Sequence, residues 1–135
     1  MSEDRLQSEV IRYIQLQYPK VRYCASLGGI YTSPTQSSKA KRNGYVRGMP
    51  DLQIMEARTM DGVLYHGLFI EIKTYKGTAT QAQKEWIDAL QERGYKAEIC
   101  KGLPAVLDLI DDYFDNQSTD QAKQLYDEYK DEKDK

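Results

Sequence analysis

The sequence has little of what zinc-binding, secreted or membrane proteins need. Its 135 residues include two cysteines and one histidine. Cys24 and Cys100 form no CxxC pair, and with His66 they fall short of the four ligands of a structural zinc site. No apolar run approaches the roughly 20 residues of a membrane span, and the first residues lack a signal-peptide pattern. We therefore expect a cytoplasmic protein without a membrane segment, in which both cysteines are reduced core residues.

The charges are unevenly distributed along the chain, although the net charge is only −2. Residues 1–50 carry 8 Lys or Arg against 3 Asp or Glu, and residues 51–110 carry 7 against 9. Residues 111–135 carry 4 against 9. Because an acidic end masks a basic front half, the negative net charge does not exclude a nucleic-acid partner.

The spacing of apolar residues predicts an α/β protein. Helices are expected over residues 4–18, 80–94 and from 103, and strands over 21–25, 50–55, 63–73 and 95–100. Asp61-Gly62 predicts a hairpin turn that joins the second and third strands as antiparallel neighbours. Thr80 with Gln83 three residues later predicts a capping box at the start of the second helix. The order predicts a sandwich of helices around a mixed sheet of about four strands.

Two segments contribute little to the expected core. Residues 26–47 contain the turn signals Gly28-Gly29, Ser33-Pro34 and Asn43-Gly44, which predict a long flexible loop. Basic residues in this loop would suit either a phosphate backbone or a solubilising surface, and these are Lys39, Lys41, Arg42 and Arg47. Residues 116–135 are rich in charge and predict a disordered or loosely helical acidic tail, which leaves 1–115 as the folded domain.

Charged residues interrupt the most strand-like stretch of the chain. Side chains alternate between the two faces of a strand, so Glu71 and Lys73 share one face while Ile70 and Ile72 share the other. Charges on a central strand are costly to desolvate unless they bind something. A divalent metal and a phosphate would fit them best.

Phosphodiester hydrolysis is the chemistry that this pattern indicates. Asp51 and Glu71 supply two carboxylates, and the Ile72 carbonyl supplies a third oxygen, for a hard cation such as Mg²⁺. Lys73 would orient the attacking water or hold the scissile phosphate. From the residues alone, Glu9 fits a solvated helix position as well as a site, and Gln83 fits capping alone.

Gly48-x-Pro50-Asp51, followed 20 positions later by Glu71-Ile72-Lys73, resembles the PD-(D/E)XK nuclease signature. Gln83, Trp86 and Gly94 extend the similarity to the VRR-NUC branch, the virus-type replication-repair nucleases, over about residues 6–113. The resemblance implies a restriction-endonuclease-like sandwich of αβββαβα order. It also implies Mg²⁺ as cofactor, with Mn²⁺ able to substitute.

The resemblance also implies roles for individual residues. Asp51 and Glu71 become metal ligands, Lys73 the catalytic lysine, Gln83 an active-site residue and Glu9 a further acidic ligand from the first helix. The residues expected to bind nucleic acid, the basic residues of the loop together with Lys76, are inferred from their charge and not from the resemblance, which the loop does not match. Small stand-alone relatives from phages and bacteria are dimeric, which implies a homodimer in a bacterial or phage-host cytosol.

The expected function is that of a divalent-metal-dependent, structure-specific DNA endonuclease that cuts branched DNA, such as Holliday junctions or flaps. Two alternatives remain open from the sequence. One is a non-catalytic module that binds or assembles on nucleic acid, and the other is a nuclease acting on RNA, since the same metal site serves either backbone.

Overall fold

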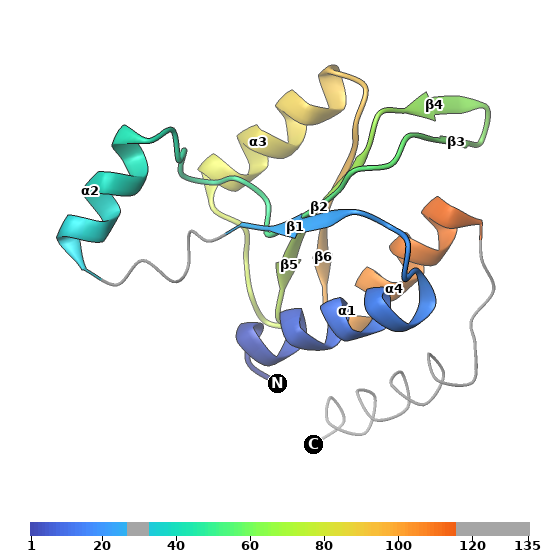
Figure 1. Ribbon diagram of the computed structural model, residues 1–135, viewed down its shortest axis with the longest axis horizontal. Helices are drawn as coiled ribbons and strands as arrows, with labels where there is room; N and C mark the ends of the chain where they lie inside the picture. The colour runs from blue at the N-terminus through green and yellow to red at the C-terminus, as the bar shows by residue number, and fades with distance from the viewer. Residues whose placement is uncertain (27–32, 116–135) are drawn as a thin grey trace.

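The computed structural model describes residues 1–26 and 33–115 (Figure 1). Its helices are α1 (Glu3–Gln17), α2 (Pro34–Arg42), α3 (Gln81–Glu92) and α4 (Leu103–Phe114). Its strands are β1 (Tyr23–Ala25), β2 (Leu52–Ile54), β3 (Arg58–Met60), β4 (Val63–Tyr65), β5 (Leu68–Lys73) and β6 (Lys96–Lys101). The predicted α/β class is confirmed. The predicted acidic tail, 116–135, lies outside the described residues.

The main sheet has four strands in the order β1-β2-β5-β6. β2 runs antiparallel to β1 and β5, while β6 runs parallel to β5, so the sheet is mixed, as predicted. β5 is central, and all six of its residues are buried. Such a strand positions its side chains firmly, because neighbours on both edges and helices on both faces fix its backbone.

Helices cover both faces of this sheet, and Figure 1 shows α1 and α4 on the opposite side from α3. Sixteen buried residues form the cluster on the α1 and α4 side, including Ile70 and Ile72 of β5. Four buried residues form the smaller cluster beneath α3, and these are Phe69, Ile87, Leu90 and Ala97. Even-numbered and odd-numbered residues of β5 therefore face opposite layers, as the sequence pattern predicted.

A buried carboxylate joins α1 to α4. Asp111 is only 6% exposed, and both of its oxygens accept hydrogen bonds from the Tyr13 hydroxyl, at 2.6 and 2.7 Å. The Tyr18 hydroxyl also donates to Asp111, at 2.6 Å. Burial, and next the hydrogen bond to Asp111, raise the pKa of Tyr13. Because a buried charge needs partners, these bonds fix how α1 docks on α4.

The prediction of a continuous loop over residues 26–47 is wrong where α2 forms. The Ser33 side chain caps this helix by accepting a hydrogen bond from the Gln36 amide at 3.1 Å, and Pro34 occupies its first turn. Both are favourable helix starts. Ala40 is the only buried residue of α2, so the sequence shows no apolar stripe that would have revealed the helix.

The Asp61-Gly62 turn connects a different pair of strands from the one predicted. It joins β3 to β4, which form a separate two-stranded sheet, whereas β2 and β5 are antiparallel neighbours without sharing a hairpin turn. Asp61 and Gly62 have φ values of 52° and 80°, the left-handed conformation that tight hairpins use. A two-residue turn of this kind pairs only the strands directly beside it.

Both cysteines are free thiols, but they differ in exposure. Cys100 is buried, as expected, whereas Cys24 is exposed on β1 because this short strand lies at the edge of the sheet. Within residues 1–26 and 33–115, no helix combines the length and the apolar character needed to cross a membrane.

Candidate active site

The pairing of β2 with β5 brings two carboxylates together. Leu52 lies opposite Ile70 and Gln53 lies opposite Phe69 in this antiparallel ladder. Continuing the register by one residue places Asp51 opposite Glu71, on the face of the sheet that α3 covers. Directly opposed side chains on one face of a ladder are close neighbours. The two acidic residues, 20 positions apart in the sequence, therefore meet where β2 begins.

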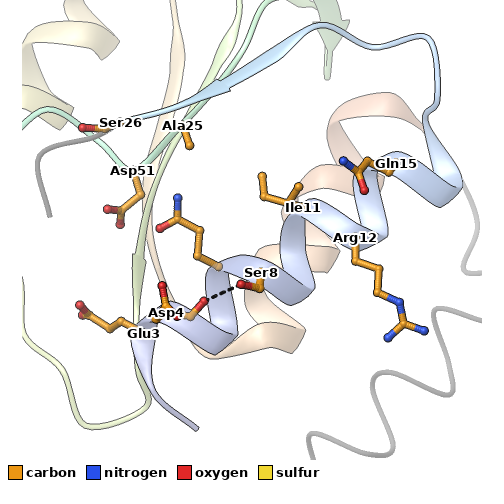
Figure 2. Close-up of a pocket in the computed structure, with 10 residues that line it drawn as sticks. Glu3, Asp4, Ser8, Ile11, Arg12, Gln15, Ala25, Ser26 and Asp51 are labelled. Carbon is orange, nitrogen blue, oxygen red and sulfur yellow. Dashed lines mark hydrogen bonds between the residues drawn. The ribbon is translucent and has the colours of Figure 1, made fainter. Parts of the chain in front are cut away.

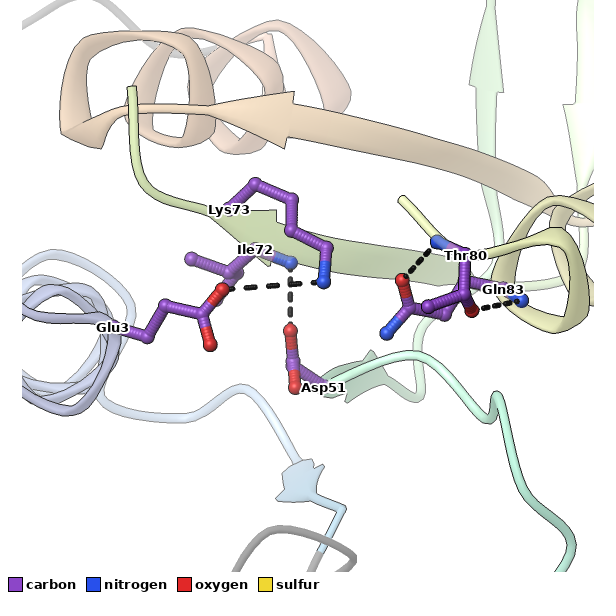
Figure 3. Close-up of polar contacts among 6 residues, drawn as sticks. All are labelled: Glu3, Asp51, Ile72, Lys73, Thr80 and Gln83. Atoms are coloured by element: carbon purple, nitrogen blue, oxygen red, sulfur yellow. Dashed lines mark hydrogen bonds and ion pairs between the residues drawn. The ribbon is translucent and has the colours of Figure 1, made fainter. Parts of the chain in front are cut away.

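The Asp51 side chain accepts a hydrogen bond from β5 where a longer β2 would have offered a backbone carbonyl. Its Oδ2 accepts a hydrogen bond from the Ile72 amide nitrogen at 2.8 Å (Figure 3). In an antiparallel ladder the N–H and C=O of one residue point to the same edge, so the Ile72 carbonyl also faces the Asp51 side. Two side-chain carboxylates and one carbonyl oxygen thus converge at the end of the ladder.

Glu71 is held in a strongly perturbed environment. It is 2% exposed. Burial, followed by the hydrogen bond and the negative charge of Asp51, raises the pKa of Glu71 to about 9 from its ordinary 4.5, while Lys73 opposes this shift. Two close carboxylates that cannot both ionise are relieved by a bound cation.

Lys73 lies on the same face as Glu71 and is 9% exposed. Its Nζ is 3.9 Å from Oε1 of Glu3, which comes from the first turn of α1 (Figure 3). Sequence reasoning missed Glu3, because acidic residues in a first helical turn are expected for the helix dipole alone. The structure nevertheless makes Glu3 the α1 residue that contacts the Lys73 side of the site.

The structure does not bring Glu9 into this cluster. Its carboxylate pairs with Arg12 at 3.5 Å. Two residues along a helix correspond to a rotation of about 200°, so Glu9 lies on the opposite side of α1 from Gln7, which lines the cavity beside Asp51. The correct side of α1 could not be read from the sequence, because packing against the sheet decides the rotation of the helix.

Gln83 forms the predicted capping box at the start of α3. Its Oε1 accepts from the Thr80 amide at 2.9 Å, and its own amide donates to Thr80 Oγ1 at 3.2 Å. Figure 3 shows its side-chain nitrogen turned toward the side on which Asp51 and Lys73 lie. The capping role therefore uses the amide oxygen and leaves the nitrogen oriented toward the site.

The chain leading to Asp51 is held against α3. Gly48 has φ +96°, and a Cβ there would lie 2.8 Å from the Ala82 carbonyl carbon. The Trp86 Nε1 donates to the Arg47 carbonyl at 3.0 Å. Only glycine permits this backbone approach, so Gly48 and Trp86 together set the path on which Asp51 reaches the ladder.

The basic residues expected to bind nucleic acid are exposed around this region. Lys39, Lys41 and Arg42 form the last turn of α2, which stands outside the layers of the sheet in Figure 1. Arg47 follows in the segment held by Trp86, and Lys76 lies in the turn after β5. The structure thus presents these cations to solvent.

The donor set suits Mg²⁺ better than a metal that needs a closed protein cage. Within the described part of the chain, no three His, Cys, Asp or Glu side chains gather into a metal-binding group. Mg²⁺ commonly binds through one or two carboxylates and keeps several waters. Asp51, Glu71 and the Ile72 carbonyl match that requirement.

Comparisons with known proteins identify the family of this chain. The family model of the VRR-NUC domain matches residues 3–104. A solved structure described as a VRR_NUC domain protein is 36% identical, with a TM-score of 0.70, over 89% of this chain and 93% of the other. A comparison with curated protein sequences gives no match. The chain belongs to the VRR-NUC family, and its fold is that of a nuclease-type domain.

Proposed function

We propose that this protein is a divalent-metal-dependent, structure-specific DNA endonuclease that hydrolyses phosphodiester bonds in branched DNA, such as Holliday junctions or flaps. One observation carries the proposal. The register of β2 against β5 sets Asp51 opposite Glu71 at a buried edge, with Lys73 on the same face. The family membership supports a nucleic-acid substrate.

Asp51, Glu71 and the Ile72 carbonyl would hold the metal. When bound, Mg²⁺ or Mn²⁺ would supply charge stabilisation for the phosphoryl oxygens and a water of lowered pKa. Burial and the neighbouring Asp51 raise the pKa of Glu71 to about 9, so a bound cation would favour its ionisation at neutral pH. This effect supports metal dependence.

Lys73 acts on the phosphate or on the attacking water. Its ammonium group shares a face with Glu71, and Glu3 keeps a negative charge beside it. A positive group aimed at developing phosphoryl charge stabilises the transition state. The side-chain nitrogen of Gln83 is a further hydrogen-bond donor on the same side.

The exposed cations bind the DNA backbone. Each phosphate contact made by a basic residue releases counterions, so binding should weaken steeply as salt increases. The α2 residues, Arg47 and Lys76 supply this sequence-independent affinity. A homodimer would provide two such sites for the two strands of a four-way junction.

The proposal is tested with a labelled four-way junction, a 5′ flap and a plain duplex. Each is incubated with Mg²⁺, Mn²⁺ or EDTA, using the wild type, Lys73→Ala and the control Lys84→Ala, whose side chain is exposed on α3. We expect metal-dependent cutting that Lys73→Ala abolishes and Lys84→Ala retains, with DNA binding preserved in both variants. Unchanged cutting by Lys73→Ala would refute the assigned mechanism.

The same assay separates the two alternatives. Binding of junctions without cutting in any metal, together with no metal binding by calorimetry, would favour a non-catalytic module. Preferential cutting of matched RNA junctions would replace DNA as the substrate. Light scattering tests the dimer, and a monomer at micromolar concentration would remove it from the proposal.

A further inference from the structure

A groove leads away from the candidate active site along α1. It has a volume of about 650 Å³ and lies between α1 and β1, with Asp51 at one end. Figure 2 shows Glu3 and Asp4 near Asp51, and Gln15 at the distant end of the row of α1 residues. The stretch from Asp4 to Gln15 corresponds to about 16 Å of helix. The volume of the groove falls within the range of about 300–1,000 Å³ that is typical of small-molecule sites.

The lining of the groove changes in chemical character along its length. Carboxylates mark the end near Asp51, where Glu3 and Asp4 lie. Apart from Arg12, the other lining residues are neutral: Gln7, Ser8, Ile11 and Gln15 on α1, with Ala25 and Ser26 near Asp51. Ser8 donates to the Asp4 carbonyl and Gln15 Nε2 donates to the Tyr23 hydroxyl at 3.0 Å, so neither side chain swings freely.

The charges in the groove do not favour a phosphate. Among the described residues that line it, Arg12 is the one cation. It pairs with Glu9 at 3.5 Å, and Figure 2 shows its guanidinium directed away from β1 and Asp51. Three carboxylates near one end would repel a phosphodiester backbone. A neutral, flat group with hydrogen-bonding edges meets no such penalty.

We propose that the groove between α1 and β1 binds an unpaired nucleobase of the strand being cut, next to the scissile phosphate. Glutamine amides offer one acceptor and two donors, which suit the edges of bases, while Ile11 and Ala25 provide apolar contact. The proposal rests on the proposed nuclease function, because the groove ends at Asp51. It names the feature of branched DNA that the enzyme recognises.

The recognition of branched DNA follows from this arrangement. A base within intact duplex is stacked and paired, and its extrusion costs the free energy of unstacking and unpairing. A base at a junction or flap is already less constrained, so it enters the groove at lower cost. Substrate selection then comes from the availability of an unpaired base, while the basic residues of α2 contribute affinity without selection.

The test measures binding of nucleosides to the full chain by NMR, in EDTA and without cleavage. Deoxyadenosine and thymidine are titrated into wild-type protein, with deoxyribose 5-phosphate as a probe that has phosphate but no base. Ile11→Trp fills the groove and Gln7→Ala removes one amide. Leu16→Trp is the matched control, because Leu16 is an exposed residue of α1 outside the groove lining.

We expect both nucleosides to shift the side-chain amide signals of Gln7 and Gln15, with dissociation constants in the millimolar range. Loss of one hydrogen bond worth about 1 kcal/mol corresponds to about a fivefold weaker constant, which is the change expected for Gln7→Ala. Ile11→Trp should abolish the shifts, and Leu16→Trp should preserve them.

Three results would overturn the inference. They are no nucleoside-induced shift in the wild type, equal shifts from the sugar phosphate, and unchanged constants in the groove variants that fold. Since no metal or cleavage enters the titration, a wild type that cuts junctions but shows no nucleoside shift refutes the groove and leaves the nuclease function standing.

Discussion

Replacing Glu71 with glutamine is expected to stabilise the metal-free protein at neutral to alkaline pH. The pKa of Glu71 is raised to about 9 in the folded chain, from 4.5. Below pH 4.5 the carboxyl is protonated in both the folded and the unfolded states, and it contributes no pH dependence. Above pH 4.5 the unfolded chain releases this proton while the folded chain retains it. The free energy of unfolding therefore falls as the pH rises toward 9.

The size of this loss follows from the shift in pKa. Each pH unit between the unfolded and the folded pKa of Glu71 lowers the free energy of unfolding by about 1.4 kcal/mol. By pH 8 the loss is on the order of 5 kcal/mol, a large part of the stability of an ordinary domain. Glutamine has nearly the same shape, keeps a hydrogen-bond donor toward Asp51 and carries no proton to lose. The Glu71→Gln protein should therefore escape this loss.

Urea unfolding in EDTA at several values between pH 5 and pH 8 measures the effect. The difference in free energy of unfolding between Glu71→Gln and the wild type should grow with pH. Adding Mg²⁺ should narrow it, because the cation stabilises the ionised wild-type pair. Glu92→Gln, at the exposed end of α3, is the control and should follow the wild type. Parallel curves for Glu71→Gln and the wild type across this range would refute the assignment of a neutral, buried Glu71.

Other substitutions test the supports of the site. Tyr13→Phe should lower the free energy of unfolding by about 2 kcal/mol in urea, since it removes a hydroxyl bonded to a buried carboxylate. In an Asp111→Ala background the same change should be neutral or stabilising, and an equal loss there would contradict this account. Gly48→Ala should lower the free energy of unfolding by more than about 2 kcal/mol and reduce cleavage, because the added Cβ would clash with the α3 backbone. Gly44 also has a positive φ, +104°, but open space surrounds it. Gly44→Ala should therefore lower the free energy of unfolding, measured by thermal unfolding, by only about 1 kcal/mol. Thr80→Ala should remove the capping box of α3 and lower the free energy of unfolding by about 1 kcal/mol. A melting temperature equal to that of the wild type would exclude this stabilising role.

The strand that carries the site could be predicted from the sequence because its pattern has one consistent solution. Alternating isoleucines and charges place Glu71 and Lys73 on one face, and the structure has this arrangement. The antiparallel pairing of β2 with β5 was predicted as well, but from the Asp61-Gly62 turn, which joins β3 to β4 instead. The alternation along β5 is a local feature that a sequence records directly, whereas the partner of a strand is not.

Features decided by distant contacts were not predictable. α2 has one buried residue, so no apolar periodicity marks it, and its capping residues Ser33 and Pro34 fit a turn equally well. The rotation of α1 about its axis depends on packing against α4 and the sheet, including the bonds of Tyr13 to Asp111. That rotation brings Glu3, rather than Glu9, toward Lys73.

The unequal clusters on the two faces of the sheet have a consequence for how the native protein opens. Within residues 1–26 and 33–115, sixteen buried residues hold the α1 and α4 side together, whereas four lie beneath α3. Regions with few buried apolar contacts open at lower free energy than the whole domain unfolds. Amide hydrogens of α3 should therefore exchange with solvent before those of α4. The start of α3, which carries Gln83, therefore belongs to the layer that opens first, while the layer of α1 and α4 keeps the chain folded.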